Sequence, residues 1–388
     1  MNDPSETARE DIRDAVSRLC ADFGDPYWRR VDAENAYPTE FVAKLTDDGW
    51  LAALIPEEYG GSGLGIGEAA TILQAVNHAG ANAAVAHAQM YLMSTVLRHG
   101  STAQKARYLP SIADGSSRLQ AFGVTEPDAG SDTTSITTTA VRSGDSYVIN
   151  GQKIFISRVE HSDLMLLLAR TSPQATGSDR TRGLSLFLVD LPRAIESGQV
   201  KVQPLDMMIN HHTTQLLIDD LEVSKVDLVG EEGEGFRYVI DSWNAERILI
   251  AAECVGDGDW FVERGSRYAT DREVFGRPLG ANQGVQFPIA DAYASIRAAE
   301  LMTYQAAERF DAGLSCGPEA NMAKYLASRA SWAAANACLD THGGYGFATE
   351  FDVERKFRET RLYTVAPVGN NLVLAYLGQH VLGMPRSY

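Results

Sequence analysis

The sequence predicts an α+β fold in which a helical N-terminal domain is followed by a β domain and then by a second helical domain. Apolar residues recur at helix spacing up to about residue 120, short β-branched runs separated by turn residues follow, and helix spacing returns after Gly235. We place the domains at residues 1–120, 121–232 and 233–388. With 388 residues the chain is long enough for several packed layers that each bury an apolar face.

The N-terminal domain is predicted to be helical because apolar residues recur at helix spacing in residues 41–51, 70–76 and 90–97. Residues 56–65 interrupt this pattern. They are too rich in glycine to continue a helix, so we expect a connection on the surface.

The middle domain is predicted to be a compact sheet of short strands. Residues 136–141 and 147–149 flank the turn sequence Ser143-Gly144-Asp145 and should pair as a hairpin. Residues 171–182 are predicted to form an exposed polar loop. Further apolar runs of strand length are residues 164–168, 184–189 and 215–218.

The C-terminal domain is predicted to begin with a long helix after Gly235, because apolar residues form one broad stripe there. The members of this stripe are Phe236, Val239, Ile240, Trp243, Leu249 and Ile250.

Charge and composition exclude several classes of partner. The formal net charge of −17 would repel phosphate backbones and anionic lipids, so we expect no nucleic acid and no membrane as partner. The first residues lack a basic and an apolar signal region, and no stretch of 18 apolar residues occurs, which favours a cytoplasmic protein. Neither the four cysteines nor the eight histidines have metal-ligand spacing, so no metal site is predicted.

Chemistry is first indicated by the polar, glycine-containing loop of residues 122–132 at the transition from helix to strand. Its amides and hydroxyls could meet a flavin ring and a pyrophosphate, although the loop alone could equally be a plain turn. The loop reads V-T-E-P-D-A-G-S-D from Val124, and residues 150–157 read N-G-Q-K-I-F-I-S. These two runs resemble V-T-E-P-x-A-G-S-D and N-G-x-K-x-W-I-T, two signatures of the acyl-CoA dehydrogenase family.

This resemblance implies FAD as cofactor and assigns residues to it. Phe155 replaces the tryptophan and Ser157 the threonine that the family most often carries, and each keeps the aromatic face or the hydroxyl. Ser131 is also assigned to the CoA arm of the substrate. The residues assigned to FAD here are Phe122, Val124, Thr125, Gly130, Ser131, Phe155 and Ser157.

Two later motifs extend the resemblance. Residues 272–279, R-E-V-F-G-R-P-L, are similar to the family's R-x-x-F-G-x-P-[IL], and residues 342–347, H-G-G-Y-G-F, to its G-G-x-G-[YF] region. Each alone would suit a surface arginine or a turn between helices. The resemblance assigns Arg272 and Gln283 to the FAD of a neighbouring subunit, and Phe275, Asp340, Gly343, Gly344 and Gly369 to FAD contacts.

The resemblance covers nearly the whole chain and implies more of the architecture. It implies that the middle β domain is antiparallel and that the C-terminal helices form a four-helix bundle. Because Arg272 would serve another subunit's FAD, it also implies at least a homodimer, with a homotetramer made of two dimers as the family expectation.

The catalytic base departs from the commonest family pattern. Dehydrogenation needs a carboxylate to remove the α proton of the acyl chain. Many relatives carry it in a Y-E-G-T motif, which here aligns with residues 366–369 and contains Pro367 instead. A smaller group, which includes isovaleryl- and long-chain acyl-CoA dehydrogenases, carries it before an arginine on the long helix, where this chain has Glu246.

Glu246 is therefore the predicted base, in preference to a surface glutamate in a salt bridge. It adjoins the apolar stripe, and burial there would shift its proton affinity toward that of a general base. Asn244 and Arg247 match positions that hold the CoA arm. Pro367 has no N–H for the thioester carbonyl, so either Val368 donates instead or the carbonyl is polarised less strongly.

The sequence thus predicts FAD-dependent α,β-dehydrogenation of an acyl-CoA thioester to the trans-2-enoyl-CoA, with electrons passing to an electron-transfer flavoprotein. Two alternatives stay open. One is a flavin oxidase or monooxygenase of the same family, and the other is a catalytically inactive subunit of a mixed oligomer. The sequence does not indicate the chain length of the acyl group.

Overall fold

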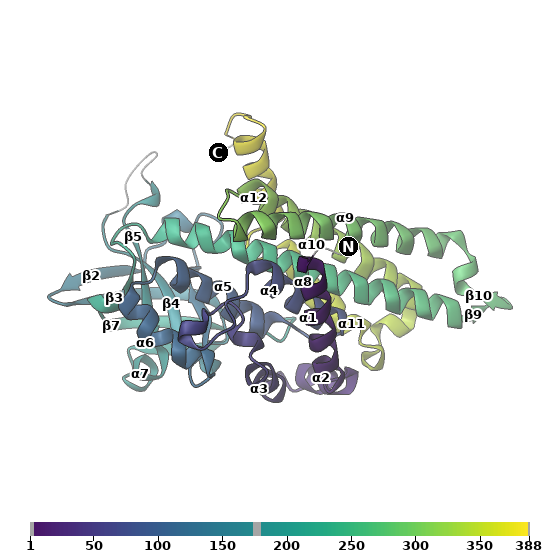
Figure 1. The fold of residues 1–388 in the computed structure, drawn as a ribbon, viewed down its shortest axis with the longest axis horizontal. Coiled ribbons are helices and arrows are strands. Elements are labelled where there is room, and N and C mark those ends of the chain that lie inside the picture. The colour runs from purple at the N-terminus through teal and green to yellow at the C-terminus, as the bar shows by residue number, and fades with distance from the viewer. Residues whose placement is uncertain (1–3, 174–179, 387–388) are drawn as a thin grey trace. The chain divides into compact units, whose positions relative to one another are not determined.

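Helices, strands and helices follow one another along the chain in the predicted order. The computed structural model describes residues 4–173 and 180–386 (Figure 1). Its contacts form two compact units. Unit 1 comprises the chain up to residue 36, residues 65–83 and the chain from residue 244 onward, and unit 2 comprises residues 37–64 and 84–243.

Unit 2 is built on an eight-stranded sheet. Seven of its strands follow the order β6-β7-β3-β2-β4-β5-β8, and the eighth, β1, pairs with β4. The strands are β1 (Leu119–Gly123), β2 (Thr139–Ser143), β3 (Ser146–Ser157), β4 (Leu164–Arg170), β5 (Leu184–Asp190), β6 (Val200–Pro204), β7 (Thr213–Ser224) and β8 (Leu228–Val229). Its helices are α3 (Thr39–Asp47), α5 (Ala84–His99), α6 (Thr102–Ala113) and α7 (Leu191–Glu196).

The predicted antiparallel sheet is confirmed with one addition. The neighbouring strands from β6 to β3, and also β2–β3, β4–β5 and β5–β8, pair antiparallel, whereas β1 and the first residue of β2 pair parallel to β4. β4 is buried along its whole length, which suits a strand with neighbours on both sides. Its apolar run gave the clearest strand signal in the sequence.

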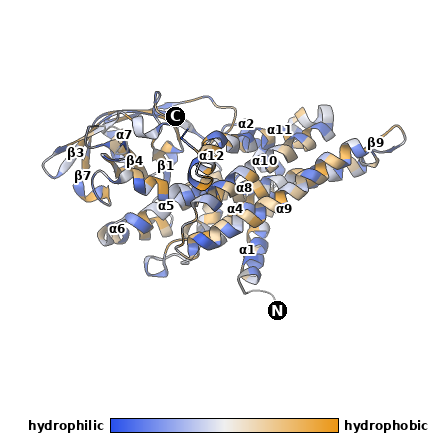
Figure 2. Ribbon diagram, turned by 90° about the horizontal axis from the view of Figure 1, so that it is seen from above, coloured by the Kyte–Doolittle hydropathy of each residue, from blue (hydrophilic) through white to orange (hydrophobic). Residues whose placement is uncertain are grey.

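Unit 1 is helical. Its helices are α1 (Pro4–Ala21), α2 (Asp25–Ala33), α4 (Ile66–His78), the part of α8 (Gly235–Asp271) from residue 244 on, α9 (Gln283–Asp311), α10 (Gly317–His342), α11 (Val353–Arg361) and α12 (Asn370–Tyr376). Helices α8, α9 and α10 run side by side, and the hairpin of β9 (Glu273–Val274) and β10 (Arg277–Pro278) connects α8 to α9 at one end (Figure 1). Hydrophilic and hydrophobic residues alternate around these helices, as expected where one face is buried (Figure 2).

Buried charges join α11 to the rest of unit 1. Arg355 donates from Nη2 to the carbonyl of Gly80 over 2.9 Å, and Lys356 donates from Nζ to that of Ala81 over 3.0 Å. Lys356 also pairs with Asp257 of α8 at 2.5 Å. All of these side chains are buried, so their charges are satisfied within the unit rather than by water.

Some local predictions differ from the structure. The hairpin of β2 and β3 is confirmed, but β2 starts at Thr139 rather than at residue 136, because Thr133–Ser135 form a helical turn that delays the strand. The long helix after Gly235 is confirmed, but Ile240 of the predicted stripe is exposed. Of the predicted loop 171–182, residues 174–179 lie outside the described residues.

Candidate active site

The loop that follows β1 in unit 2 is folded back on itself. The Glu126 N–H donates to the Ala129 carbonyl and the Ala129 N–H donates to the Glu126 carbonyl, each over 3.1 Å, which closes a tight turn around Pro127 and Asp128. Beyond this turn Gly130 and Ser131 are exposed. A Cβ atom on Gly130 would have no heavy atom within 4 Å, so the loop leaves open space where it was predicted to meet the cofactor.

A buried ion pair joins this loop to β3. Lys153 lies in β3 and is fully buried, and its Nζ donates to Glu126 Oε1 over 2.9 Å and to the Val124 carbonyl over 3.0 Å. The Ile154 N–H also donates to the Thr125 carbonyl over 2.9 Å. The two sequence motifs are therefore one structural element, in which β3 fixes the backbone of residues 124–126.

Burial disfavours the charged form of both members of this ion pair, and their interactions oppose that effect. Burial alone would raise the pKa of Glu126, but the Lys153 charge and hydrogen bonds from Thr137 and Thr138 outweigh it and lower that pKa to about 2. Burial lowers the pKa of Lys153 to about 8, and the Glu126 charge opposes this change. At neutral pH both groups remain charged, which maintains the ion pair between the loop and β3.

Phe155 is presented to solvent by an irregular stretch of β3. The pairing of β3 with β7 shifts register between Lys153 and Ile156, and Phe155 adopts a left-handed φ of 60°. This φ is costly for a bulky residue, and such conformations cluster at functional sites. The ring is 56% exposed and adjoins Ile154, whose N–H donates to the Thr125 carbonyl, so an aromatic face is available beside residues 124–126.

Glu246 lies on α8 in unit 1 and is only 6% exposed. The next residue, Arg247, is also buried, and its Nη1 donates to Asn244 Oδ1 over 3.3 Å. Burial lowers the pKa of Arg247, and the charge of Glu246 opposes that change. The structure thus brings together the three residues predicted on this helix, with a carboxylate and a guanidinium in one buried neighbourhood.

A buried lysine that the sequence analysis missed also lies in this neighbourhood. Lys324 of α10 is fully buried, and its charge interacts with those of Glu246 and Arg247. It stands among small residues of α10, with Ala320 and Ser328 one turn away on either side. A lysine in the middle of a small-residue stripe is the signal that could have revealed it.

The predicted neighbour-subunit contacts gather at one end of the long helices in unit 1. Phe275 and Gly276 form the tip of the β9–β10 hairpin with φ values of 55° and 75°, and the Phe275 side chain is 101% exposed. Gln283 is the first residue of α9, and the Arg272 guanidinium lies 5.8 Å from the centre of the Tyr345 ring.

The remaining predicted residues of unit 1 lie at ends of helices. Asp340 is exposed near the end of α10. Gly343 and Gly344 follow that helix, and a Cβ atom on either glycine would have no heavy atom within 4 Å. Gly369 precedes the first residue of α12. The glycine pair is therefore open enough for a phosphate to approach its backbone.

Comparisons with known proteins agree with this arrangement. The models of the N-terminal, middle and C-terminal domains of acyl-CoA dehydrogenases match residues 6–116, 121–221 and 233–375. The chain belongs to the acyl-CoA dehydrogenase family. It is 34% identical over 383 residues to the acyl-CoA dehydrogenase FadE12 of Mycobacterium tuberculosis, covering 98% of this chain and 97% of that protein.

Solved structures of other proteins have the same fold. The glutaryl-coenzyme A dehydrogenase glutaryl-CoA complex superposes with a TM-score of 0.88 at 28% identity and covers 100% of this chain and 97% of its own. The prolyl acyl carrier protein oxidase AnaB superposes with a TM-score of 0.89 at 25% identity and covers 98% and 99%. The predicted fold class and the assignment as an oxidoreductase of this family are therefore confirmed.

The family implies a flavin, and the residues present fit FAD. Phe155 offers an exposed aromatic face, while Gly130, Gly343 and Gly344 leave space beside their backbones. The hydroxyl of Ser131 is exposed, and Arg272 carries a guanidinium of the kind that pairs with a pyrophosphate. Which of these groups touch FAD remains a prediction.

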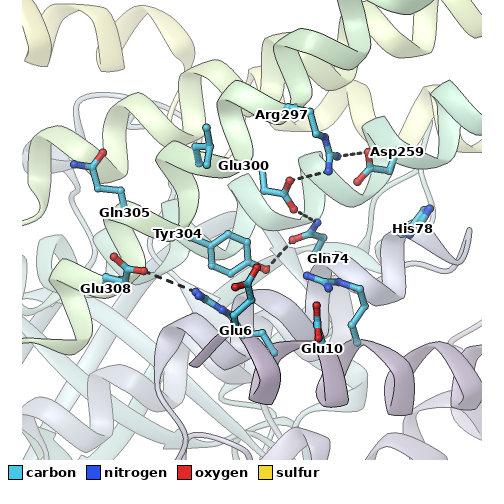
Figure 3. A pocket seen from close by; sticks show the side chains of 13 residues that line it. Glu6, Glu10, Gln74, His78, Asp259, Arg297, Glu300, Tyr304, Gln305 and Glu308 are labelled. Atoms are coloured by element: carbon cyan, nitrogen blue, oxygen red, sulfur yellow. Dashed lines mark hydrogen bonds and ion pairs between the residues drawn. The ribbon is translucent and has the colours of Figure 1, made fainter. Parts of the chain in front are cut away.

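A polar cavity of about 710 Å³ in unit 1 has a different character (Figure 3). Several of its polar and charged side chains are paired with one another. Gln74 Nε2 donates to Glu300 Oε1 over 2.7 Å, and Arg297 lies 2.7 Å from Glu300. Tyr304 donates its hydroxyl to Gln74 over 2.8 Å. None of the described residues that line it is a predicted site residue, and several of its polar side chains bind one another.

Two other features are absent from the described residues. No group of three or more histidine, cysteine or acidic side chains in residues 4–173 and 180–386 is arranged to hold a metal ion. No helix in these ranges combines the length and the apolarity needed to cross a bilayer.

Proposed function

We propose that this protein catalyses the FAD-dependent α,β-dehydrogenation of an acyl-CoA thioester, with Glu246 as the base that removes the α proton. The observation that carries the proposal is a buried glutamate on α8 beside two buried cations, in a chain whose usual base position holds Pro367. Burial withdraws a carboxylate from water and positive neighbours favour its charged form, and both conditions suit proton abstraction.

In the proposed reaction the Glu246 carboxylate takes the proton from Cα, and the pair of electrons left in that C–H bond forms the new double bond as hydride leaves Cβ. When bound, FAD would supply the acceptor for this hydride. The chain's own contribution is to place the carboxylate and to keep it charged. Arg247 balances the base, and Asn244 accepts the hydrogen bond that holds the guanidinium.

The partners follow from the same proposal. The substrate is an acyl-CoA, the electron acceptor an electron-transfer flavoprotein, and the assembly at least a homodimer in which Arg272 and Phe275 serve the FAD of the partner. The protruding hairpin with its exposed Phe275 supports the last point, because such an apolar tip favours contact with another chain. Ser131 and Arg247 are proposed to contact the CoA arm.

The test is anaerobic bleaching of the flavin by a panel of short, branched and long acyl-CoAs. Wild type should lose its yellow colour with at least one of them, and Glu246→Gln should bind FAD but bleach at least about 10³-fold more slowly. Glu253→Gln is the matched control, because Glu253 is a buried glutamate on the same helix that accepts a hydrogen bond from Tyr363. Equal bleaching by wild type and Glu246→Gln contradicts the assignment of the base.

A second candidate is a flavin oxidase, which the similarity to AnaB supports. Its distinguishing observation is consumption of oxygen during turnover. Oxygen uptake equal to product formation, with no stimulation by an electron-transfer flavoprotein, would favour the oxidase. Turnover only with an added acceptor would favour the dehydrogenase.

A further inference from the structure

Lys324 holds the segment that replaces the family's usual base. Its Nζ donates to the Val368 carbonyl over 2.7 Å and to Asn370 Oδ1 over 2.8 Å. Asn370 in turn donates from Nδ2 to Ser328 Oγ over 3.2 Å. One buried ammonium group on α10 therefore anchors residues 368–370, which are more than 40 positions later in the chain.

These hydrogen bonds fix the direction of a backbone donor. A trans peptide unit is planar, and its C=O and N–H point in opposite directions. Because the Val368 carbonyl points at Lys324, the Gly369 N–H of the same peptide unit points away from it. In a segment where Pro367 has no N–H, the orientation of this peptide determines where a remaining donor is aimed.

Lys324 is also a charge next to the proposed base. Its charge interacts with Glu246 and Arg247, and neither of its two hydrogen-bond acceptors is charged. Burial lowers the pKa of Lys324 to about 8, so the group is still mostly protonated at neutral pH. Besides one another and Glu246, Arg247 is affected by the charges of Cys316 before α10 and Tyr376 of α12, and Lys324 by that of Cys254 of α8.

We propose that Lys324 is a positioning residue for the reaction, whose ammonium group fixes residues 368–370 by hydrogen bonds and places a positive charge near Glu246. This inference rests on the proposed function of Glu246. It gives Lys324 two separable roles, one through hydrogen bonds to the segment and one through charge.

Two substitutions separate these roles. Lys324→Met removes both the charge and the hydrogen bonds of Lys324, whereas Asn370→Ala removes one of its two hydrogen bonds, together with the contact of Asn370 with Ser328, and leaves the charge. The measurement is the rate of flavin bleaching by saturating acyl-CoA from pH 5 to pH 9, together with KM. Glu253→Gln serves as the control on α8.

With the cation removed, Glu246 should take up its proton more readily, so that activity is lost at a higher pH on the acidic side. We expect the acidic limb of the Lys324→Met variant, that is, the low-pH side of its curve of bleaching rate against pH, to move up by about one pH unit. Relative to wild type, its rate should then fall about tenfold more at pH 5 than at pH 8. Asn370→Ala should leave the limb in place and lower kcat/KM. A limb of Lys324→Met that coincides with that of wild type overturns the charge role, and an unchanged kcat/KM in Asn370→Ala overturns the anchoring role.

The controls keep this test independent of the proposed function. If no acyl-CoA bleaches wild type, or if Glu246→Gln bleaches normally, the proposed function has failed. If both behave as proposed and the Lys324→Met limb is unshifted, only the Lys324 inference has failed. Lys324→Gln, whose amide can still donate to Val368, gives the same readout should Lys324→Met not fold, and an unshifted limb there is equally decisive.

Discussion

Two buried lysines, one in each unit, each donate a hydrogen bond to a backbone carbonyl of a predicted site segment but differ in their second partner. Lys153 donates to the Val124 carbonyl and to the carboxylate of Glu126, whereas Lys324 donates to the Val368 carbonyl and to the amide of Asn370. Burial lowers the pKa of each to about 8. A carbonyl that accepts a hydrogen bond from a buried ammonium group is fixed more firmly than one that faces water.

The difference between them lies in where the charge is balanced. Glu126 balances Lys153 at contact distance, so that lysine has a structural role beside the loop of residues 124–132. Both contacts of Lys324 are neutral, and its charge acts instead on Glu246 and Arg247. Comparing the two lysines therefore separates an anchor that stabilises the fold from one that is proposed to affect the reaction as well.

The largest expected effect is on the stability of unit 2. Lys153→Met leaves Glu126 buried without its cation and should lower the free energy of unfolding by about 3–5 kcal/mol. Lys324→Met leaves only neutral acceptors unsatisfied and should cost about 1–3 kcal/mol. Urea denaturation of both variants measures the difference. The double variant Lys153→Met/Glu126→Gln should recover part of the loss, and equal costs for the two lysines would contradict the comparison.

A smaller effect is expected from acid. The pKa of Glu126 is about 2 in the folded chain and near 4.5 in an unfolded one, so the unfolded chain takes up the proton first as pH falls. The stability that Glu126 contributes is thus complete above about pH 4.5 and is lost progressively toward pH 2. Urea denaturation at pH 5 and pH 3 should show a smaller decline for Glu126→Gln than for wild type.

The matched control for the acid experiment is Asn370→Ala, at the corresponding position of the other lysine. An amide does not titrate, so this substitution should change the free energy of unfolding by the same amount at both pH values. A pH-dependent difference there would mean that the two anchors are more alike in charge than the structure indicates.

The smallest effect on stability is expected at Phe155, which is exposed where Lys153 is buried. Phe155→Ala should change the free energy of unfolding by less than about 0.5 kcal/mol. Loss of an aromatic contact should nevertheless weaken FAD binding by about tenfold, as measured by flavin fluorescence titration. Phe155→Trp, which restores the commoner family residue, should bind FAD at least as well as wild type. Unchanged FAD affinity in Phe155→Ala would remove Phe155 from the proposed cofactor contacts.

The sequence predicted those features that depend on local pattern. The apolar run of β4 and the stripe of α8 identified their elements, since period and length suffice for a fully buried strand and a long helix. The pairing of Glu126 with Lys153 was not predicted, although both residues lie in the quoted motifs. A sequence shows that two charges are present, but not that folding removes both from water at one point.

The proposed base illustrates the same limit. Glu246 was predicted because the motif and the neighbouring stripe adjoin it in sequence. Lys324, 78 residues further on, reaches the same neighbourhood only through the packing of α10. The identity of the residue alone does not distinguish a buried lysine from one on the surface. The left-handed φ of Phe155 was likewise not predicted, because it arises from a register shift against β7.

The protruding β9–β10 hairpin has a consequence for handling the protein in solution. If its Arg272 and Phe275 contact the FAD of another subunit, cofactor affinity and subunit association are linked, and each stabilises the other by mass action. Dilution should then release FAD together with the separation of subunits, and an excess of free FAD should delay both. The colour of a stock solution would in this way report its state of assembly.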